Sequence, residues 1–300
     1  MYGSSSSSPK LARIVALIGA LGLASSFAGP EPAPASKDLT LESTAPATEI
    51  VRSSHGLITT EGPSGMFINP TSATLPQGAF VLNYCVFVPT IPEGVGAVWH
   101  GILLSYGVRD WLEVGFTGNL ADVSLDGPPA REDSFVFAGP MARIRLLRDH
   151  DWWPELSIGG YLKEGTPANV NNGEDAFIAV SKTFPIDESG FLKTVTLQGG
   201  FREQWLHDEA PVSNINRAYG GVEVQVPQNI YLIGEIMSKD ARVERRVPWA
   251  AGIQWRGKWF GCTIAAVQID GETGPGFYFG VGGGLGAEPV RSSAPPPSRR

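Results

Sequence analysis

Six charged residues lie at alternating positions within otherwise apolar segments. They are the residues of this chain best placed for chemistry: Glu113, Arg143, Arg145, Arg202, Glu223 and Glu235. In each segment the charged residue has the parity opposite to that of the large apolar side chains, so in a β-strand it would point to the other face. Charges of both signs around a narrow interior either form a constriction that selects polar solutes, or pair into a salt-bridged and closed interior. The sequence leaves both interpretations open.

Residues suited to hydrolysis or metal binding do not cluster along the chain. The four histidines, His55, His100, His150 and His207, are far apart, and none has the spacing of a metal-ligand pair. Neither a Gly-x-Ser-x-Gly elbow nor a His-Glu-x-x-His motif occurs. We therefore expect no enzymatic activity, no metal and no cofactor. A membrane hydrolase remains an alternative, which would need a Ser or Asp beside one of the histidines.

The elements that would position the six charges are short segments of alternating apolar and polar residues between Gly78 and Gly286. About twelve such segments are present, and most have the 9 to 11 residues of a tilted membrane strand, or slightly more. They are expected near 79–88, 98–108, 111–121, 134–146, 154–164, 175–184, 192–206, 217–226, 230–239, 247–256, 259–269 and 276–286. The pattern predicts an all-β fold, a single antiparallel up-and-down transmembrane β-barrel of about 12 strands, because a closed barrel satisfies every backbone hydrogen bond inside lipid.

The connections between these segments alternate in length. Arg109-Asp110 and Gln228-Asn229 are tight turns, whereas residues 124–133, 166–174 and 207–216 form longer polar loops. This asymmetry is typical of outer-membrane barrels, in which the short turns are periplasmic. An even number of strands then predicts that both termini are periplasmic and that the protein is in the cell outer membrane.

A soluble secreted β-sandwich that binds a ligand through its loops is the main alternative fold. In a sandwich, large aromatic residues concentrate in the middle of the strands, where two sheets face each other. Here most tryptophans, Trp111, Trp153 and Trp249 among them, lie near expected strand ends. That placement favours the aromatic girdles of a membrane barrel.

The regions flanking the expected barrel have distinct compositions. Residues 1–28 carry Lys10 and Arg13, an apolar stretch and a small-x-small site ending at Ala28, which predicts a signal peptide. Residues 29–58 are predicted to be a flexible linker rich in Pro and Ala, and residues 59–77 an ordered lead-in segment at the barrel mouth. Residues 78–286 are the expected barrel, and residues 287–300 a disordered tail.

Charge and cysteine content limit the partners. The net charge of −7 argues against a nucleic-acid partner, which favours a basic face. The two cysteines, Cys85 and Cys262, fall on expected strands that are not neighbours along the chain. Free thiols that act as small packing residues are favoured, although a disulfide would form if the barrel brought the two together.

The lead-in segment contains Gly62-Pro63-Ser64-Gly65-Met66-Phe67-Ile68-Asn69-Pro70-Thr71-Ser72-Ala73. Followed by Gly78 and an alternating strand, it resembles the opening of YjbH-like outer-membrane proteins. The resemblance implies an outer-membrane barrel associated with exopolysaccharide production or export. The expected partners are outer-membrane lipid, the barrel-assembly machinery and a polysaccharide or small polar solute, and the expected function is a porin-like channel or scaffold for transport.

Overall fold

The structure, a computed structural model, describes residues 65–90, 95–125, 131–150, 152–166, 173–187, 189–206, 214–242, 246–257, 260–269 and 274–285. The expected signal peptide (1–28), linker (29–58) and tail (287–300) lie outside these residues. So do the first six residues of the lead-in segment and His55, His207 and Trp259.

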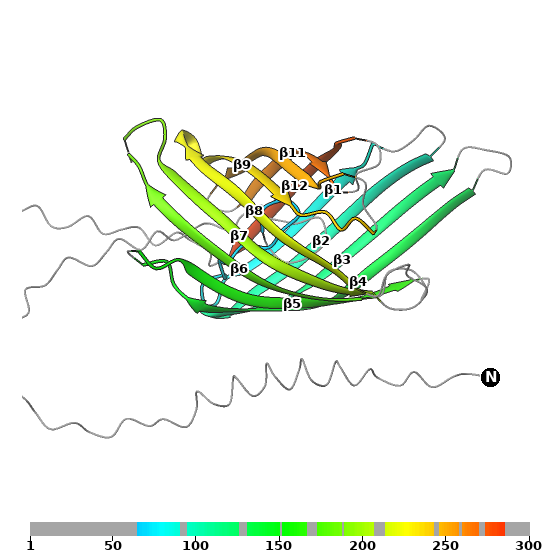
Figure 1. The fold of residues 1–300 in the computed structure, drawn as a ribbon, viewed down its shortest axis with the longest axis horizontal. Coiled ribbons are helices and arrows are strands. Elements are labelled where there is room, and N and C mark those ends of the chain that lie inside the picture. Colours follow the sequence, from blue (N-terminus) through cyan, green and yellow to red (C-terminus); the bar gives the residue numbers. More distant parts are fainter. Residues whose placement is uncertain are drawn as a thin grey trace, which may run out of the picture. The chain divides into compact units, whose positions relative to one another are not determined.

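Within the described residues, the chain forms a single antiparallel sheet that closes on itself as a barrel of twelve strands (Figure 1). The strands are β1 (Phe80–Val88), β2 (Val95–Arg109), β3 (Leu112–Leu125), β4 (Arg131–Leu147), β5 (Glu155–Thr166), β6 (Gly173–Pro185), β7 (Thr194–Leu206), β8 (Asn214–Val226), β9 (Ile230–Met237), β10 (Trp249–Arg256), β11 (Phe260–Gln268) and β12 (Gly276–Leu285). Each strand pairs with its neighbours in sequence, and β1 pairs with β12 from Phe80↔Leu285 to Val88↔Phe277. This closure confirms the predicted barrel and excludes the two-sheet sandwich.

The strand ends differ from the sequence expectation mainly on one side of the barrel. β2, β3 and β4 each extend several residues beyond the expected range at the end where the long connections lie. The tight turns lie at the opposite end of the barrel from the long connections. Between β8 and β9, Gln228 and Asn229 both have positive φ values, 63° and 58°, the conformation that lets a short hairpin turn match the twist of its strands.

Side chains alternate strictly between the two faces of the wall. On β1, Val81, Asn83 and Cys85 are buried inside, whereas Phe80 and Leu82 are exposed outside. The same parity places large apolar side chains on the exterior of every strand and most polar ones in the interior. Gln268 is one of the polar residues with outward parity, and its Oε1 accepts a hydrogen bond of 3.2 Å from Nε1 of Trp249, the residue paired with it on β10.

The two cysteines are free thiols on opposite faces of the sheet. Cys85 points into the barrel, whereas Cys262 alternates with the buried Gly261 and Thr263 and points outward. Strands β1 and β11 both flank β12, yet the intervening wall separates the two sulfurs.

No helix in the described part of the chain is both long and apolar enough to cross a bilayer.

Candidate functional site

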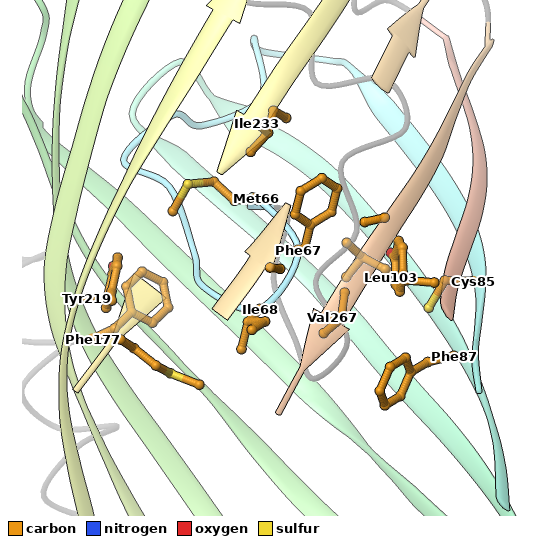
Figure 2. Packing of buried hydrophobic residues seen from close by; sticks show 14 of the residues in the cluster. Met66, Phe67, Ile68, Cys85, Phe87, Leu103, Phe177, Tyr219, Ile233 and Val267 are labelled. Atoms are coloured by element: carbon orange, nitrogen blue, oxygen red, sulfur yellow. The ribbon is translucent and has the colours of Figure 1, made fainter. Parts of the chain in front are cut away.

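The interior of the barrel is occupied by the chain's own residues that precede β1. Gly65 and Pro70 form an antiparallel bridge, and Met66 N–H donates to the carbonyl oxygen of Asn69 at 2.9 Å, which together define a tight turn. Met66 and Phe67 are fully buried. Figure 2 shows them in the middle of the barrel, with Tyr219 on one side of the wall and Cys85 on the other. We call residues 65–77 the interior segment.

The tip of the interior segment is bound by one carboxylate, that of Glu235 on β9. Its Oε1 accepts hydrogen bonds from the backbone N–H groups of Phe67 (2.8 Å) and Ile68 (2.6 Å). Its Oε2 accepts from Asn69 N–H (3.2 Å) and from Asn69 Nδ2 (2.9 Å). The carboxylate therefore accepts hydrogen bonds from several buried donors at once. Each such hydrogen bond to a charged group is stronger than one between neutral groups.

Other strands bind the rest of the interior segment. Tyr219 on β8 donates its hydroxyl to the carbonyl oxygen of Pro70 at 3.0 Å. Arg143 on β4 donates to the carbonyl oxygen of Ala73, and Leu75 N–H donates to Glu113 on β3 at 3.1 Å. Ser72 Oγ donates to Glu155 Oε2 at 3.0 Å and also contacts the hydroxyl of Ser181. With Glu235 on β9, these hydrogen bonds come from six strands, β3 to β6, β8 and β9, so the segment is held laterally on several sides.

The base of the interior segment is anchored to the turn between β2 and β3. Thr74 Oγ1 donates to the carbonyl oxygen of Asp110 at 2.7 Å, and Gln77 N–H donates to Asp110 Oδ1 at 2.9 Å. The hydrogen bond from Gln77, and then the nearby Arg148 guanidinium, lower the pKa of the Asp110 carboxyl below its ordinary value. Because the folded pKa is the lower one, this anchor is fully present above the ordinary carboxyl pKa and is lost as the pH falls through the lowered value.

Two buried ion pairs lie on the wall beside the interior segment. Arg202 on β7 binds Asp175 Oδ2 through Nε at 3.1 Å and Nη2 at 2.6 Å, and Tyr161 donates its hydroxyl to the same oxygen at 2.6 Å. Arg256 on β10 binds both carboxylate oxygens of Glu223 on β8, at 3.1 and 2.5 Å. Buried charges must be paired and hydrogen-bonded to be tolerated, and each of these carboxylates accepts at least two hydrogen bonds from its arginine.

The six expected charged residues all point into the barrel, but they do not face one another as a single ring. Glu113, Arg143 and Glu235 bind the interior segment, whereas Arg202 and Glu223 pair with wall residues. Arg145 pairs with Glu155 at 3.3 Å.

Several functional partners were missed by sequence reasoning: Tyr161, Asp175, Glu155, Tyr219 and Arg256. All five have the inward parity of their strands, so alternation was the available signal. Asp175 and Arg256 lie near expected strand ends, where parity is hard to assign from sequence.

Metal binding and hydrolysis find no support among the residues that the structure describes. There, no three His, Cys, Asp or Glu side chains are grouped to hold a metal ion. His100 lies outside the barrel, with its Nδ1 2.7 Å from the hydroxyl of Tyr84. The absence of enzymatic activity stays a prediction.

Neither the comparison with protein families nor the comparison with curated proteins gives a match for this chain. Among solved structures, the chain is similar to the translocator domain of the autotransporter NalP from Neisseria meningitidis, at 11% identity and a TM-score of 0.36, over 69% of this chain and 87% of that one. It is also similar to CdiB from Acinetobacter baumannii, at 9% identity and a TM-score of 0.36, over 70% and 60% of the two chains. A third similarity is to the outer membrane protein OprG from Pseudomonas aeruginosa, at 8% identity and a TM-score of 0.23, over 72% and 99%. Likeness at this level carries no functional conclusion.

Proposed function

We propose that this chain is an integral outer-membrane β-barrel that provides a passage or scaffold for a polar solute, and that its interior segment closes the passage at rest. The observation that carries the proposal is the contrast between the two faces of the closed barrel: the exterior is apolar and the interior is charged. A soluble protein seldom exposes so continuous an apolar surface.

The exterior has the dimensions of a lipid-facing belt. On β6 the outward residues from Ala176 to Phe184 are apolar except for Lys182, whose Nζ is neutralised by Asp149 at 2.6 Å. Eight steps of about 3.3 Å, on a strand tilted by about 40°, give roughly 20 Å along the barrel axis, which is comparable with the apolar band of about 25 Å in outer-membrane barrels. The outward acids Asp122, Glu174 and Glu203 all lie near the ends of their strands at the long loops, so they bound this belt.

The orientation follows from the connections. The start of β1 and the end of β12 lie at the end of the barrel with the tight turns, because the number of strands is even. We place this end in the periplasm, as in other barrels with short turns on one side.

The interior segment supports a closed resting state. Its main chain is bound by residues of β3, β4, β8 and β9, and its side chains are buried in the apolar cluster at the centre of the barrel. Passage of a solute would require the segment to leave or to shift.

Two measurements test this function. We expect the membrane-extracted protein to migrate differently on a denaturing gel when boiled and unboiled, as a detergent-resistant closed barrel does. In planar bilayers we expect the native protein to conduct little, and a full chain in which residues 66–75 are replaced by ten Gly and Ser residues to conduct steadily. Extraction without detergent, or equal conductance of the two proteins, would reject the proposal.

A link to exopolysaccharide export is the finer part of the proposal. It is supported by the resemblance of residues 62–73 to the opening of YjbH-like proteins. Loss of secreted polysaccharide on deletion of the protein, restored by the native chain, would be the expected result.

A further inference from the structure

Most hydrogen bonds between the barrel and the interior segment involve the main chain of the segment and not its side chains. Glu235 accepts from three consecutive backbone N–H groups, at positions 67 to 69. Tyr219 and Arg143 donate to the carbonyl oxygens of Pro70 and Ala73. Glu113 accepts from the N–H of Leu75.

The wall supplies acceptors to backbone N–H groups of the segment and donors to its backbone carbonyl oxygens. The Glu235 carboxylate accepts hydrogen bonds from the N–H groups of the turn. The Tyr219 phenol and the Arg143 guanidinium donate to carbonyl oxygens, and a second carboxylate, that of Glu113, accepts from the N–H of Leu75. Every backbone unit carries one such donor and one such acceptor, whatever its side chain. Recognition through the main chain is therefore largely independent of sequence.

The side chains of the segment need only be apolar and fit the space. Met66 Sδ lies against β8, where a Cβ added at Gly221 would come within 2.4 Å of it. Phe67 packs edge-on against Tyr278 of β12, with ring centroids 6.0 Å apart. Apolar packing of this kind tolerates changes of shape at roughly constant volume better than a hydrogen-bonded site tolerates the loss of a partner.

We propose that the barrel interior is a binding site for a polypeptide segment that enters as a turn and is recognised by its main chain, and that residues 66–75 are its resident occupant. This rests on the proposed function and deepens it, since it names the polar solute as a peptide segment. The covalent link gives the resident segment a high effective concentration, so a free peptide binds only when that segment is removed or displaced.

The test is peptide binding to the full-length barrel in detergent, measured by the fluorescence anisotropy of a labelled peptide with the sequence of residues 65–77. The receptor is the chain with residues 66–75 replaced by Gly and Ser, and the native chain is the matched control. We expect the variant to bind the peptide at least tenfold more tightly than the native chain does. A Gly107→Val variant, which leaves every wall group of the site intact, serves as receptor if the Gly/Ser variant lacks the mobility shift of a folded barrel.

Two further peptides separate main-chain recognition from other modes. A peptide N-methylated at positions 67, 68 and 69 loses the donors to Glu235, and we expect it to bind at least tenfold more weakly. A peptide with Met66→Leu, Phe67→Leu and Ile68→Val keeps the main chain and the apolar character, and we expect its affinity to stay within about threefold. An uncharged oligosaccharide is expected not to displace the labelled peptide.

Failure of the native-sequence peptide to bind a folded receptor would overturn the inference, as would unchanged binding after N-methylation or displacement by the oligosaccharide. Because binding is measured without a bilayer, the result is independent of conductance. Binding without conductance would reject the passage and keep the peptide site, and conductance without binding would do the reverse.

Discussion

At the scale of single residues, Glu235 binds the tip of the interior segment through both of its carboxylate oxygens. Its carboxylate is buried and accepts four hydrogen bonds from residues 67 to 69. A buried donor left without an acceptor costs about 1 to 3 kcal/mol. The residue therefore determines whether the tip of the segment stays in place.

We predict that Glu235→Ala releases the interior segment. Because water replaces part of the lost contacts, we expect the free energy that holds the segment in the barrel to fall by about 3 kcal/mol. This change shifts the equilibrium between bound and released segment by about a hundredfold. Bilayer conductance should rise accordingly. Added formate should lower it again, because a small carboxylate fits the vacated ring of N–H groups.

Glu203→Ala is the matched control, since Glu203 faces outward near the end of β7 and contacts Asn214. It should leave conductance unchanged. A Glu235→Ala protein as closed as the native one would contradict the role assigned to this carboxylate.

A second residue-scale prediction concerns the pair of Arg202 and Asp175, both almost fully buried. Arg202→Leu leaves the Asp175 carboxylate buried without its cation, which should lower the free energy of unfolding by about 3 to 5 kcal/mol. Urea titration of the protein in lipid vesicles measures this. Replacing both residues by Leu should recover much of the loss, and Arg242→Leu, which removes a half-exposed side chain paired with Asp240, should have little effect.

At the scale of elements, the base of the interior segment packs directly against β2. A Cβ on Gly107 would lie 2.0 Å from the carbonyl oxygen of Pro76, which is backbone and cannot rotate away. The carbonyl oxygen of Gly107 also accepts a 2.7 Å hydrogen bond from Gly78 N–H. Gly78 has a φ of +80°, a conformation that glycine adopts without strain as the chain turns into β1.

We predict that Gly107→Val displaces the base of the interior segment while the barrel still closes. Cys85 reports this, because its thiol is buried in the apolar cluster around Phe67. Its labelling by a water-soluble maleimide should be at least tenfold faster in the variant. Gly118→Ala is the control, since its added Cβ would have only one ring atom, 4.0 Å away, within contact distance.

At the scale of the whole molecule, the barrel has an apolar exterior, which we propose faces lipid, and an interior filled by its own chain. The proposed belt makes a depth-dependent prediction. Ile178 is exposed near the middle of β6, so Ile178→Arg should destabilise the protein in lipid by about 2 to 4 kcal/mol.

Asn216→Arg, on an outward position near the long-loop end of β8, should cost less than about 1 kcal/mol. Folding titrations in vesicles compare the two variants. Equal costs at both depths would argue that the exterior does not face a bilayer.

The sequence by itself determined the architecture. Alternation has a period of two, so it places Phe80 and Leu82 on one face and Asn83 and Cys85 on the other whatever the strand pairing. The even number of strands and the tight turns fixed the antiparallel order. These features are local, because the alternation of each strand can be read from its own consecutive residues.

Only the tertiary structure decided what the interior charges do. Alternation places Glu113, Arg143 and Glu235 inside the barrel. Inward-pointing charges are equally compatible with a constriction, with a salt-bridged interior and with a bound segment. The partners of Glu235 lie about 167 residues away in the chain, and no local pattern encodes a contact of that separation. Closure of β1 on β12 brought the lead-in residues into the barrel, where desolvated carboxylates need donors and the backbone of residues 67–69 supplies them.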